Sequence, residues 1–152
     1  KSQQILLTTV YVQELLNSID ALMRPRLVEQ GIALSCQVSS PDLTLNGDVN
    51  LLEQVLINLI LNAARAVKEV PKPQVWLTAG ELENGKVYIQ VRDNGTGIPE
   101  ELMESIFIPF FTSHKDGSGI GLSLAKHIML LHKGSIQVES QEGVGSVFTL
   151  TF

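Results

Sequence analysis

The chain has 152 residues, with 11 Lys and Arg against 16 Asp and Glu, which gives a formal net charge of −5. This length suits one domain with its own hydrophobic core, and the charge argues against binding to the backbone of nucleic acids. A single cysteine, Cys36, excludes an internal disulfide and fits a reducing compartment. No apolar run reaches the roughly 18 residues that a membrane span needs, so we expect no membrane contact by this domain.

The first part of the chain predicts one amphipathic helix and several short strands. Apolar residues recur at helical spacing over residues 12–30, and Gly31 follows as a natural end. Pro25 lies inside this stretch and should kink or divide the helix. Strands are predicted at residues 8–12, 33–38 and 43–45, and residues 1–7 carry no strong signal and would be the tail of an upstream element.

A second helix, predicted over residues 51–70 with Asp48 as its N-cap, is apolar on nearly all sides and therefore buried. Asn58, Asn62 and Arg65 stand in it at positions i, i+4 and i+7, within about 60° of one helical face. Polar groups inside an apolar helix are costly unless they are bonded. They indicate one wall of a pocket; the alternative is that both asparagines tie down neighbouring backbone.

The second part of the chain predicts more strands than helices. Asn84-Gly85 between two alternating segments is typical of a hairpin, whose second arm ends at Asp93. The other predicted elements are a short helix at 100–105, an irregular stretch at 107–119, a helix at 120–132 and strands at 135–140 and 146–152. Helices and an antiparallel-rich sheet, each with one buried face, predict a two-layer α/β sandwich.

Two glycine-rich segments are candidates for ligand binding. Asp93 begins the segment with Gly95 and Gly97; its carboxylate accepts hydrogen bonds only and would suit the exocyclic amine of adenine. The alternative is an ordinary Asx-turn. Residues 117–122, at a helix N-terminus, could offer backbone N–H groups to phosphate; the alternative is a flexible loop with a helix cap.

Histidine and phenylalanine residues are two further candidates for a role in function. His127 and His132 lie about 140° apart around a helix and have no acidic or cysteine partners, so they do not predict a metal site. Phe107, Phe110 and Phe111 precede the second glycine-rich segment. They predict either a contribution to the core or the hinge of a mobile lid.

The order and spacing of these motifs resemble the catalytic domain of sensor histidine kinases. The matching segments are residues 58–64 with the N box, 93–99 with the G1 box, 106–112 with the F box, 117–122 with the G2 box and 143–146 with the loop between the closing strands. The resemblance covers residues 10–152. It implies the ATP-binding fold shared with type II topoisomerases, heat-shock chaperones and mismatch-repair ATPases, in which a mixed, largely antiparallel sheet of about five strands packs on three helices, here over residues 8–152.

The resemblance also implies roles for individual residues. Asn62 would hold Mg²⁺, Asn58 and Arg65 would line the phosphate side, Asp93 would bind the adenine amine, and Gly97 would pack beside the base. The other nucleotide-binding residues would be Gly95, Ile98, Phe107, Thr112, His114, Lys115, Gly117, Ser118, Gly119, Ile120, Gly121 and Leu122.

Two positions depart from relatives of this family. Asn58 stands where topoisomerase-type ATPases carry a glutamate that activates water, so hydrolysis should be slow and ATP should be kept for transfer to a protein. His114, followed by Lys115, stands where many histidine kinases carry a lysine in the loop that covers the phosphates.

The sequence has no box of the kind that surrounds a phosphoacceptor histidine, and it begins with Lys1 rather than Met. We therefore expect the Mg²⁺-ATP-binding domain of a bacterial two-component sensor kinase, which presents the γ-phosphate to a histidine on a separate dimerising hairpin. A response regulator would act downstream, and the parent protein would be anchored in the membrane with this domain in the cytoplasm. The alternatives are an anti-sigma-factor-type serine kinase and a degenerate nucleotide-binding or scaffolding module.

Overall fold

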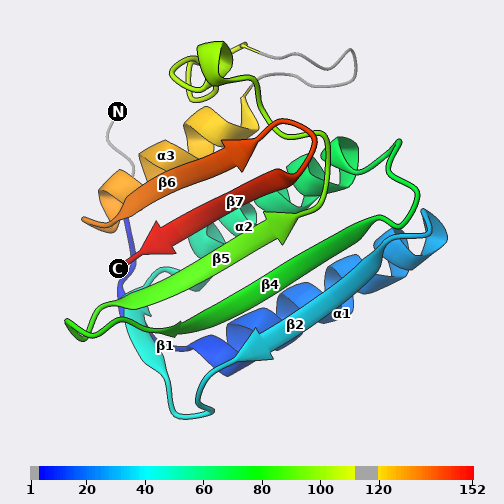
Figure 1. Ribbon diagram of the computed structural model, residues 1–152. Helices are drawn as coiled ribbons and strands as arrows, with labels where there is room; N and C mark the ends of the chain where they lie inside the picture. Colours follow the sequence, from blue (N-terminus) through cyan, green and yellow to red (C-terminus); the bar gives the residue numbers. More distant parts are fainter. Residues whose placement is uncertain (1–3, 112–119) are drawn as a thin grey trace.

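Three helices pack on one face of a five-stranded sheet in the computed structural model, which describes residues 4–111 and 120–152 (Figure 1). In chain order the elements are β1 (Thr8–Tyr11), α1 (Val12–Glu29), β2 (Ala33–Val38), β3 (Thr44–Gly47), α2 (Val49–Ala66), β4 (Gln74–Glu81), β5 (Val87–Asp93), the 3₁₀ turn η1 (Glu100–Leu102), α3 (Gly121–Leu131), β6 (Ser135–Gln141) and β7 (Gly145–Thr151).

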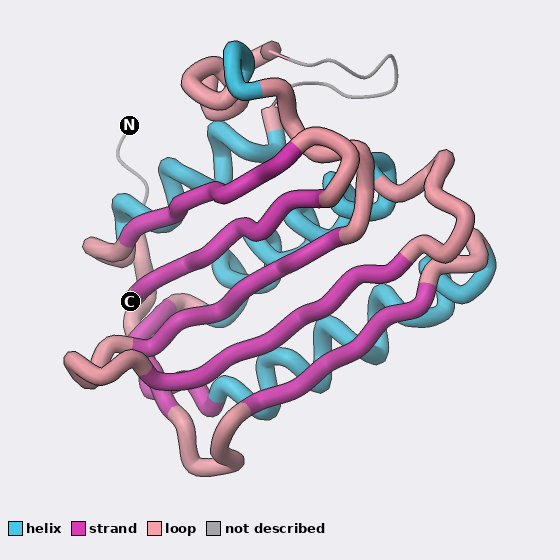
Figure 2. Tube along the Cα trace, in the orientation of Figure 1, coloured by secondary structure: helices cyan, strands magenta, loops and turns pink. Residues whose placement is uncertain are grey.

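The sheet has the strand order β2-β4-β5-β7-β6. Only the β2–β4 pair in it is parallel, and β4–β5, β5–β7 and β6–β7 are antiparallel. The strands β1 and β3 form a separate antiparallel pair, which the sequence did not predict as a sheet. Figure 2 shows all three helices behind one face of the sheet, with the other face open. The two-layer sandwich and the mixed five-stranded sheet on three helices are therefore confirmed.

The core lies between the inner face of the sheet and helix α2. Leu77, Ile89 and Phe148, from three neighbouring strands, are fully buried, as are Leu56 and Leu59 of α2. Alternation explains the strand contribution, because successive side chains point to opposite faces of a sheet. On strand β5 the residues with odd numbers, which end with Asp93, are buried against the helices. A helix that is apolar almost all round is thus held at the centre of the molecule.

Helix α2 begins two residues before the predicted range, directly after the predicted N-cap, and ends earlier than predicted. The Leu51 N–H donates to Asp48 Oδ1 over 3.2 Å, which confirms Asp48 as the N-cap. The helix stops at Ala66 rather than at Val70. The reason is a distant contact: the Ala66 carbonyl accepts the Thr96 N–H over 3.1 Å. The loop after β5 therefore packs against the C-terminal end of α2.

Two other predictions need correction. Pro25 does not divide the first helix, since α1 runs without a break from Val12 to Glu29. Pro25 is exposed, so water can satisfy the carbonyl group that its missing N–H leaves free. The helix predicted at residues 100–105 is only the 3₁₀ turn η1, held by bonds between residues three apart, such as Met103 N–H to the Glu100 carbonyl.

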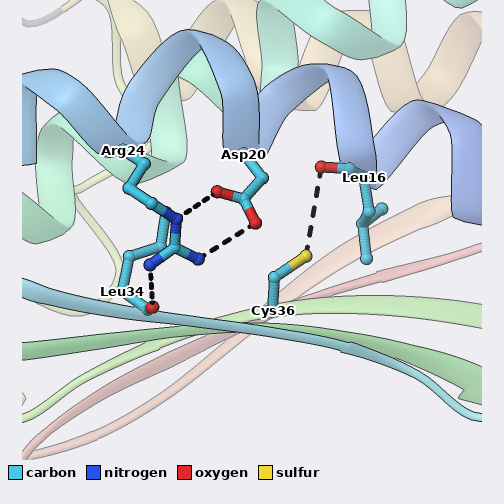
Figure 3. Close-up of polar contacts among 5 residues, drawn as sticks. All are labelled: Leu16, Asp20, Arg24, Leu34 and Cys36. Atoms are coloured by element: carbon cyan, nitrogen blue, oxygen red, sulfur yellow. Dashed lines mark hydrogen bonds and ion pairs between the residues drawn. The ribbon is translucent and has the colours of Figure 1, made fainter.

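Helix α1 is fastened to the edge strand β2 by a polar cluster (Figure 3). Arg24 makes a two-pronged ion pair with Asp20 and donates from Nη1 to the Leu34 carbonyl over 2.8 Å. The Cys36 thiol lies beside this pair, 3.9 Å from the Leu16 carbonyl oxygen, and burial raises its pKa. These contacts set the position of α1, on the side of the sheet away from α3.

Candidate functional site

The polar face of α2 points toward helix α3. Asn58 and Asn62 are both half-buried, and a Cβ placed on Gly121, the first residue of α3, would lie 3.6 Å from the Asn58 side chain. Within the residues that the structure describes, neither carboxamide makes a hydrogen bond. The alternative in which both asparagines tie down neighbouring backbone is therefore absent here, and their polar groups remain available to a ligand.

Arg65 completes this face. Its Nε atom is buried, and among the described residues it is the one buried side-chain nitrogen or oxygen without a hydrogen-bond partner. A buried donor without a partner destabilises the fold by about 1–3 kcal/mol, so native proteins rarely leave one. A phosphate oxygen would satisfy a guanidinium donor through a charge-assisted bond. This orphaned atom fits the phosphate side of a nucleotide.

Asp93 is a buried carboxylate, with only 3% of the residue exposed. The Gly95 N–H donates to its Oδ1 over 2.8 Å, so the Asx-turn alternative from the sequence is present in the structure. Burial raises the pKa of the Asp93 carboxyl, and the N–H groups of Gly95 and Ser146 oppose that rise. The turn and a ligand role are compatible, because a carboxylate can accept several hydrogen bonds.

The loop after Asp93 is held between two other parts of the chain. On one side Gly95 approaches α2 so closely that an added Cβ would clash with the Ala66 carbonyl. On the other side Gly97, with φ of +76°, leaves no room for a Cβ beside the Gln141 carbonyl in the turn between β6 and β7. Because Ala66 follows Arg65 directly, this packing brings the Asp93 loop to the same end of α2 as the Arg65 side chain.

The remaining predicted residues fall into two groups. Ile98 and Phe107 are half-buried, and the Lys126 ammonium of α3 lies 5.4 Å from the centre of the Phe107 ring. Phe107 and Phe111 pack at the edge of the core, whereas Phe110 is 75% exposed. Ile120 is exposed, and Gly121 and half-buried Leu122 begin α3. Thr112, His114, Lys115, Gly117, Ser118 and Gly119 lie outside the described residues.

The structure adds two residues that the sequence reasoning missed. Ser140 of β6 accepts the Ile98 N–H over 2.7 Å, and its Oγ lies 2.8 Å from the hydroxyl of Ser146 on β7. Ser146 is 4% exposed. The only signal in the sequence is their place at the predicted 143–146 loop, which Ser146 ends and Ser140 precedes by three residues. That signal does not reveal that Ile98 is the partner of Ser140.

His132 has a structural role. Its Nε2 accepts the Asp48 N–H over 3.0 Å, and its Nδ1 lies 2.9 Å from the Ile128 carbonyl oxygen, to which it donates in that tautomer. The residues that the structure describes contain no group of three His, Cys, Asp or Glu that could hold a metal ion. The histidine thus joins the C-terminal end of α3 to the N-terminal end of α2.

A cavity of about 280 Å³ borders the same strand ends from the opposite side. Arg92, Glu139 and Val147 line it from the open face of the sheet, and Asp93, Ser140 and Ser146 are also among its lining residues. The Asp93 side chain, in contrast, shares the helix-facing side with Ile89 and Val91. We assign the candidate site to the helix side, where Asp93, Asn58 and Arg65 lie.

These groups suit a ligand with an amine at one end and an anion at the other. The Asp93 carboxylate accepts from an amine, and the Arg65 guanidinium and the start of α3 favour negative charge. Glycines between them allow a flat group to approach the backbone. An adenine nucleotide has these two features.

The comparisons with known proteins agree with this geometry. The family model described as "Histidine kinase-, DNA gyrase B-, and HSP90-like ATPase" matches residues 47–152. Sensor histidine kinase ZraS of Escherichia coli (strain K12) is 43% identical over 106 residues, which are 70% of this chain and 22% of ZraS. The chain spans about a fifth of the length of the curated relatives it matches.

Three solved structures have the same fold. The nucleotide-free catalytic domain of histidine kinase ThkA has a TM-score of 0.85 at 32% identity, with 97% of each chain covered. Full-length ShkA in complex with AMPPNP has a TM-score of 0.87 at 30% identity, with 99% of this chain and 32% of that chain covered. Histidine kinase ThkA in complex with response regulator protein TrrA has a TM-score of 0.84 at 31% identity, covering 100% of this chain and 43% of that one.

The names of these relatives favour the histidine kinase prediction over the anti-sigma-factor-type serine kinase. The family match covers both the α2 face and the Asp93 loop, and the fold similarity extends over almost the whole chain. The chain therefore belongs to the histidine kinase-, DNA gyrase B- and HSP90-like ATPase family, and within it the chain is an ATP-binding catalytic domain of the histidine kinase type.

Proposed function

We propose that this domain binds Mg²⁺-ATP between α2, α3 and the loop after Asp93, and presents the γ-phosphate to a histidine on a separate dimerising hairpin of the parent protein. The observation that carries the proposal is the buried Arg65 Nε, which has no partner among the described residues. A phosphate oxygen bound at the end of α2 would accept a hydrogen bond from this donor and so satisfy it. The AMPPNP complex of ShkA supports the choice of nucleotide.

Each side chain of the site has one part in this binding. Asp93 accepts from the adenine amine, and the loop from Gly95 to Ile98 packs beside the base. Asn58 and Arg65 bind phosphate oxygens. Asn62 supplies an amide oxygen to Mg²⁺, which usually keeps several waters and bridges phosphates, so few protein ligands suffice. When bound, the metal neutralises charge on the phosphates during transfer.

Transfer to a protein, rather than to water, follows from the residue at position 58. Asn58 has no basic group, and an asparagine cannot remove a proton from water. The nucleotide then stays intact until a nucleophile arrives in line with the γ-phosphate. We place that nucleophile on the hairpin because sensor histidine kinases such as ZraS are far longer than this chain.

The partners and the location extend the proposal to the whole protein. The complex of ThkA with TrrA supports a response regulator as the downstream partner. Residues 1–7 would link this domain to the hairpin, in a parent sensor anchored in the membrane with the domain in the cytoplasm. No helix within the described residues is long and apolar enough to cross a membrane.

Calorimetric titration of the chain with the non-hydrolysable analogue Mg²⁺-AMPPNP tests the proposal. We expect one binding site per chain and competition by ADP. Guanosine diphosphate should compete poorly, because guanine carries a carbonyl oxygen where adenine carries the amine that faces Asp93. Absence of binding, or equal competition by the two diphosphates, would contradict the assignment of an adenine nucleotide site.

A further inference from the structure

The turn between β6 and β7 is the outer support of the loop that follows Asp93. Figure 1 shows this turn lying over the chain that leaves β5. The Gly143 N–H donates to the Thr96 carbonyl over 2.8 Å, and Gly97 packs directly on the Gln141 carbonyl. Strand register places Ser140 opposite Ser146, and Ser146 opposite Asp93. The two serines therefore lie beside both ends of the Asp93 loop.

The hydroxyl group of Ser140 makes three contacts. It lies 2.7 Å from Ile98 N, 3.1 Å from the Gly145 carbonyl oxygen and 2.8 Å from Ser146 Oγ. A backbone N–H can only donate and a carbonyl can only accept, so Ser140 accepts from Ile98 and donates to Gly145. A serine hydroxyl has one hydrogen and two lone pairs, so Ser146 has to donate to Ser140. The Ser140 hydroxyl is thereby saturated by protein groups.

These bonds connect the two ends of the loop. At one end, Ser146 is paired with Asp93 across strands β5 and β7. At the other end, Ser140 accepts the Ile98 N–H. The bond between the two serine hydroxyls joins these two points, so Asp93 and the Ile98 backbone are connected through the strand pair and two side chains as well as through the loop itself. A network of this kind, fully satisfied, keeps its members in one arrangement.

We propose that Ser140 is a positioning residue for base recognition, which sets the spacing between the Asp93 carboxylate and the Gly97–Ile98 backbone and so determines the preference for adenine over hypoxanthine. This inference rests on the proposed function of the site. Adenine offers an amine to Asp93, whereas hypoxanthine carries a carbonyl oxygen at the same position and repels a carboxylate. The discrimination is strong only if the loop cannot move the base away from Asp93.

The test compares ADP with inosine diphosphate by calorimetry on this 152-residue chain and its variants. Ser140→Ala removes all three hydroxyl contacts, and Ser140→Thr keeps the hydroxyl. Ser135→Ala, an exposed serine at the other end of the same strand, is the matched control. We expect Ser140→Ala to lower the ADP-to-inosine-diphosphate affinity ratio by about tenfold, the effect of losing one to two net hydrogen bonds. Ser140→Thr should restore most of that ratio, and Ser135→Ala should leave it unchanged.

The ratio separates positioning from a purely structural role. A variant that is merely less stable binds both diphosphates with the same loss, so its ratio stays at the wild-type value. An unchanged ratio in folded Ser140→Ala would overturn the inference while leaving the nucleotide site intact. If wild-type chain fails to bind ADP at all, the proposed function itself is wrong. Should Ser140→Ala not fold, Ser140→Cys, with a thiol that is a weak hydrogen-bond partner, carries the same expectation.

Discussion

At the scale of single residues, the site is marked by polar groups that the fold leaves strained or unpaired. Asp93 is a buried carboxylate at the end of β5, and the buried Arg65 Nε has no acceptor among the residues that the structure describes. Either group lowers the stability of the empty domain. Functional sites are where proteins tolerate such losses, because the ligand recovers them on binding. Four predictions, on Asp93, Arg65 and Asn62, follow from this view.

The first concerns Asp93 and recognition of the base. Asp93→Ala should weaken ADP and ATP alike by about 2–4 kcal/mol, or roughly 30- to 1,000-fold, because it removes a charged acceptor from a buried contact. The measurement is calorimetry with both nucleotides on folded protein. An unchanged affinity for ADP would show that the adenine amine is bound elsewhere.

The stability of Asp93→Asn tests the same group without a ligand. Burial raises the pKa of the Asp93 carboxyl above its unfolded value. A group whose pKa is higher in the folded than in the unfolded protein stabilises the fold at low pH. This contribution is complete below the unfolded pKa, near 3.9, and is lost as the pH rises through the folded pKa. The free energy of unfolding of Asp93→Asn relative to wild type should therefore increase between about pH 3 and 7 in urea titrations. If the difference in the free energy of unfolding between Asp93→Asn and wild type does not change with pH, the Asp93 carboxylate is not buried as the structure has it.

Arg65→Met separates binding from stability. The substitution removes the unpartnered Nε donor while keeping an unbranched side chain, so the free energy of unfolding should stay level or rise by about 1 kcal/mol. ATP affinity should fall by roughly tenfold or more, and adenosine affinity should not change. Arg92→Met, on the open face of the sheet, is the matched control and should leave ATP affinity unchanged. Loss of adenosine binding in Arg65→Met would point to a structural role.

The metal prediction belongs to Asn62. Asn62→Ala should abolish the part of ATP affinity that depends on Mg²⁺ and should leave adenosine binding nearly intact, because only the phosphates and the metal lose a ligand. Titrations of ATP with Mg²⁺ and with EDTA measure this part directly. If Mg²⁺ strengthens ATP binding equally in both proteins, another residue holds the metal.

At the scale of elements, the site is built where three segments meet: the end of α2, the loop after β5 and the β6–β7 turn. Close backbone approach at Gly97 makes this junction, and the junction is testable with two alanine substitutions. Gly97 and Gly143 have similar φ values of +76° and +80°, yet a Cβ clashes with the Gln141 carbonyl only at Gly97. The pair therefore separates steric contact from backbone strain.

Gly97→Ala should displace the loop and reduce ADP affinity by at least tenfold, with a loss of stability above 1 kcal/mol. Gly143→Ala meets nothing within 4 Å, so it should show only the cost of a positive φ, about 1 kcal/mol, with ADP affinity retained. Thermal unfolding and calorimetry on both variants provide the comparison. Equal loss of ADP affinity would mean that the close approach at Gly97 is unimportant.

At this scale, the features that the sequence could predict are those that produce a local periodic pattern. The spacing of Asn58, Asn62 and Arg65 shows that they share a face, and alternation along β5 shows that Asp93 faces inward. The end of α2 could not be predicted, because the Ala66 carbonyl is taken by Thr96, thirty residues later in the chain. Ser140 was missed for the same reason, since its partner Ile98 lies 42 residues away. Hydrogen bonds between residues far apart in the chain produce no repeating pattern of residue types in the sequence.

At the scale of the whole molecule, the helix that completes the core is a different one from the helices that carry the candidate site. Helix α1, fastened to the edge strand by Arg24 and Asp20, completes the core, while the candidate site residues come from α2, α3 and the loop after β5, which lie away from α1 (Figure 1). Asn58 stands where a glutamate would activate water. Under the proposed function, the domain holds a nucleotide for transfer to another protein domain.

Phosphoryl transfer in trans tests this account most directly. The chain is mixed with Mg²⁺-ATP labelled at the γ-phosphate and with the dimerising hairpin of its parent, and acid-labile phosphohistidine is measured on each component. We expect label on the hairpin histidine, none on His114, His127 or His132, and loss of the signal in Asn62→Ala. Stable labelling of this chain itself, or an unlabelled hairpin despite bound Mg²⁺-ATP, would contradict the account.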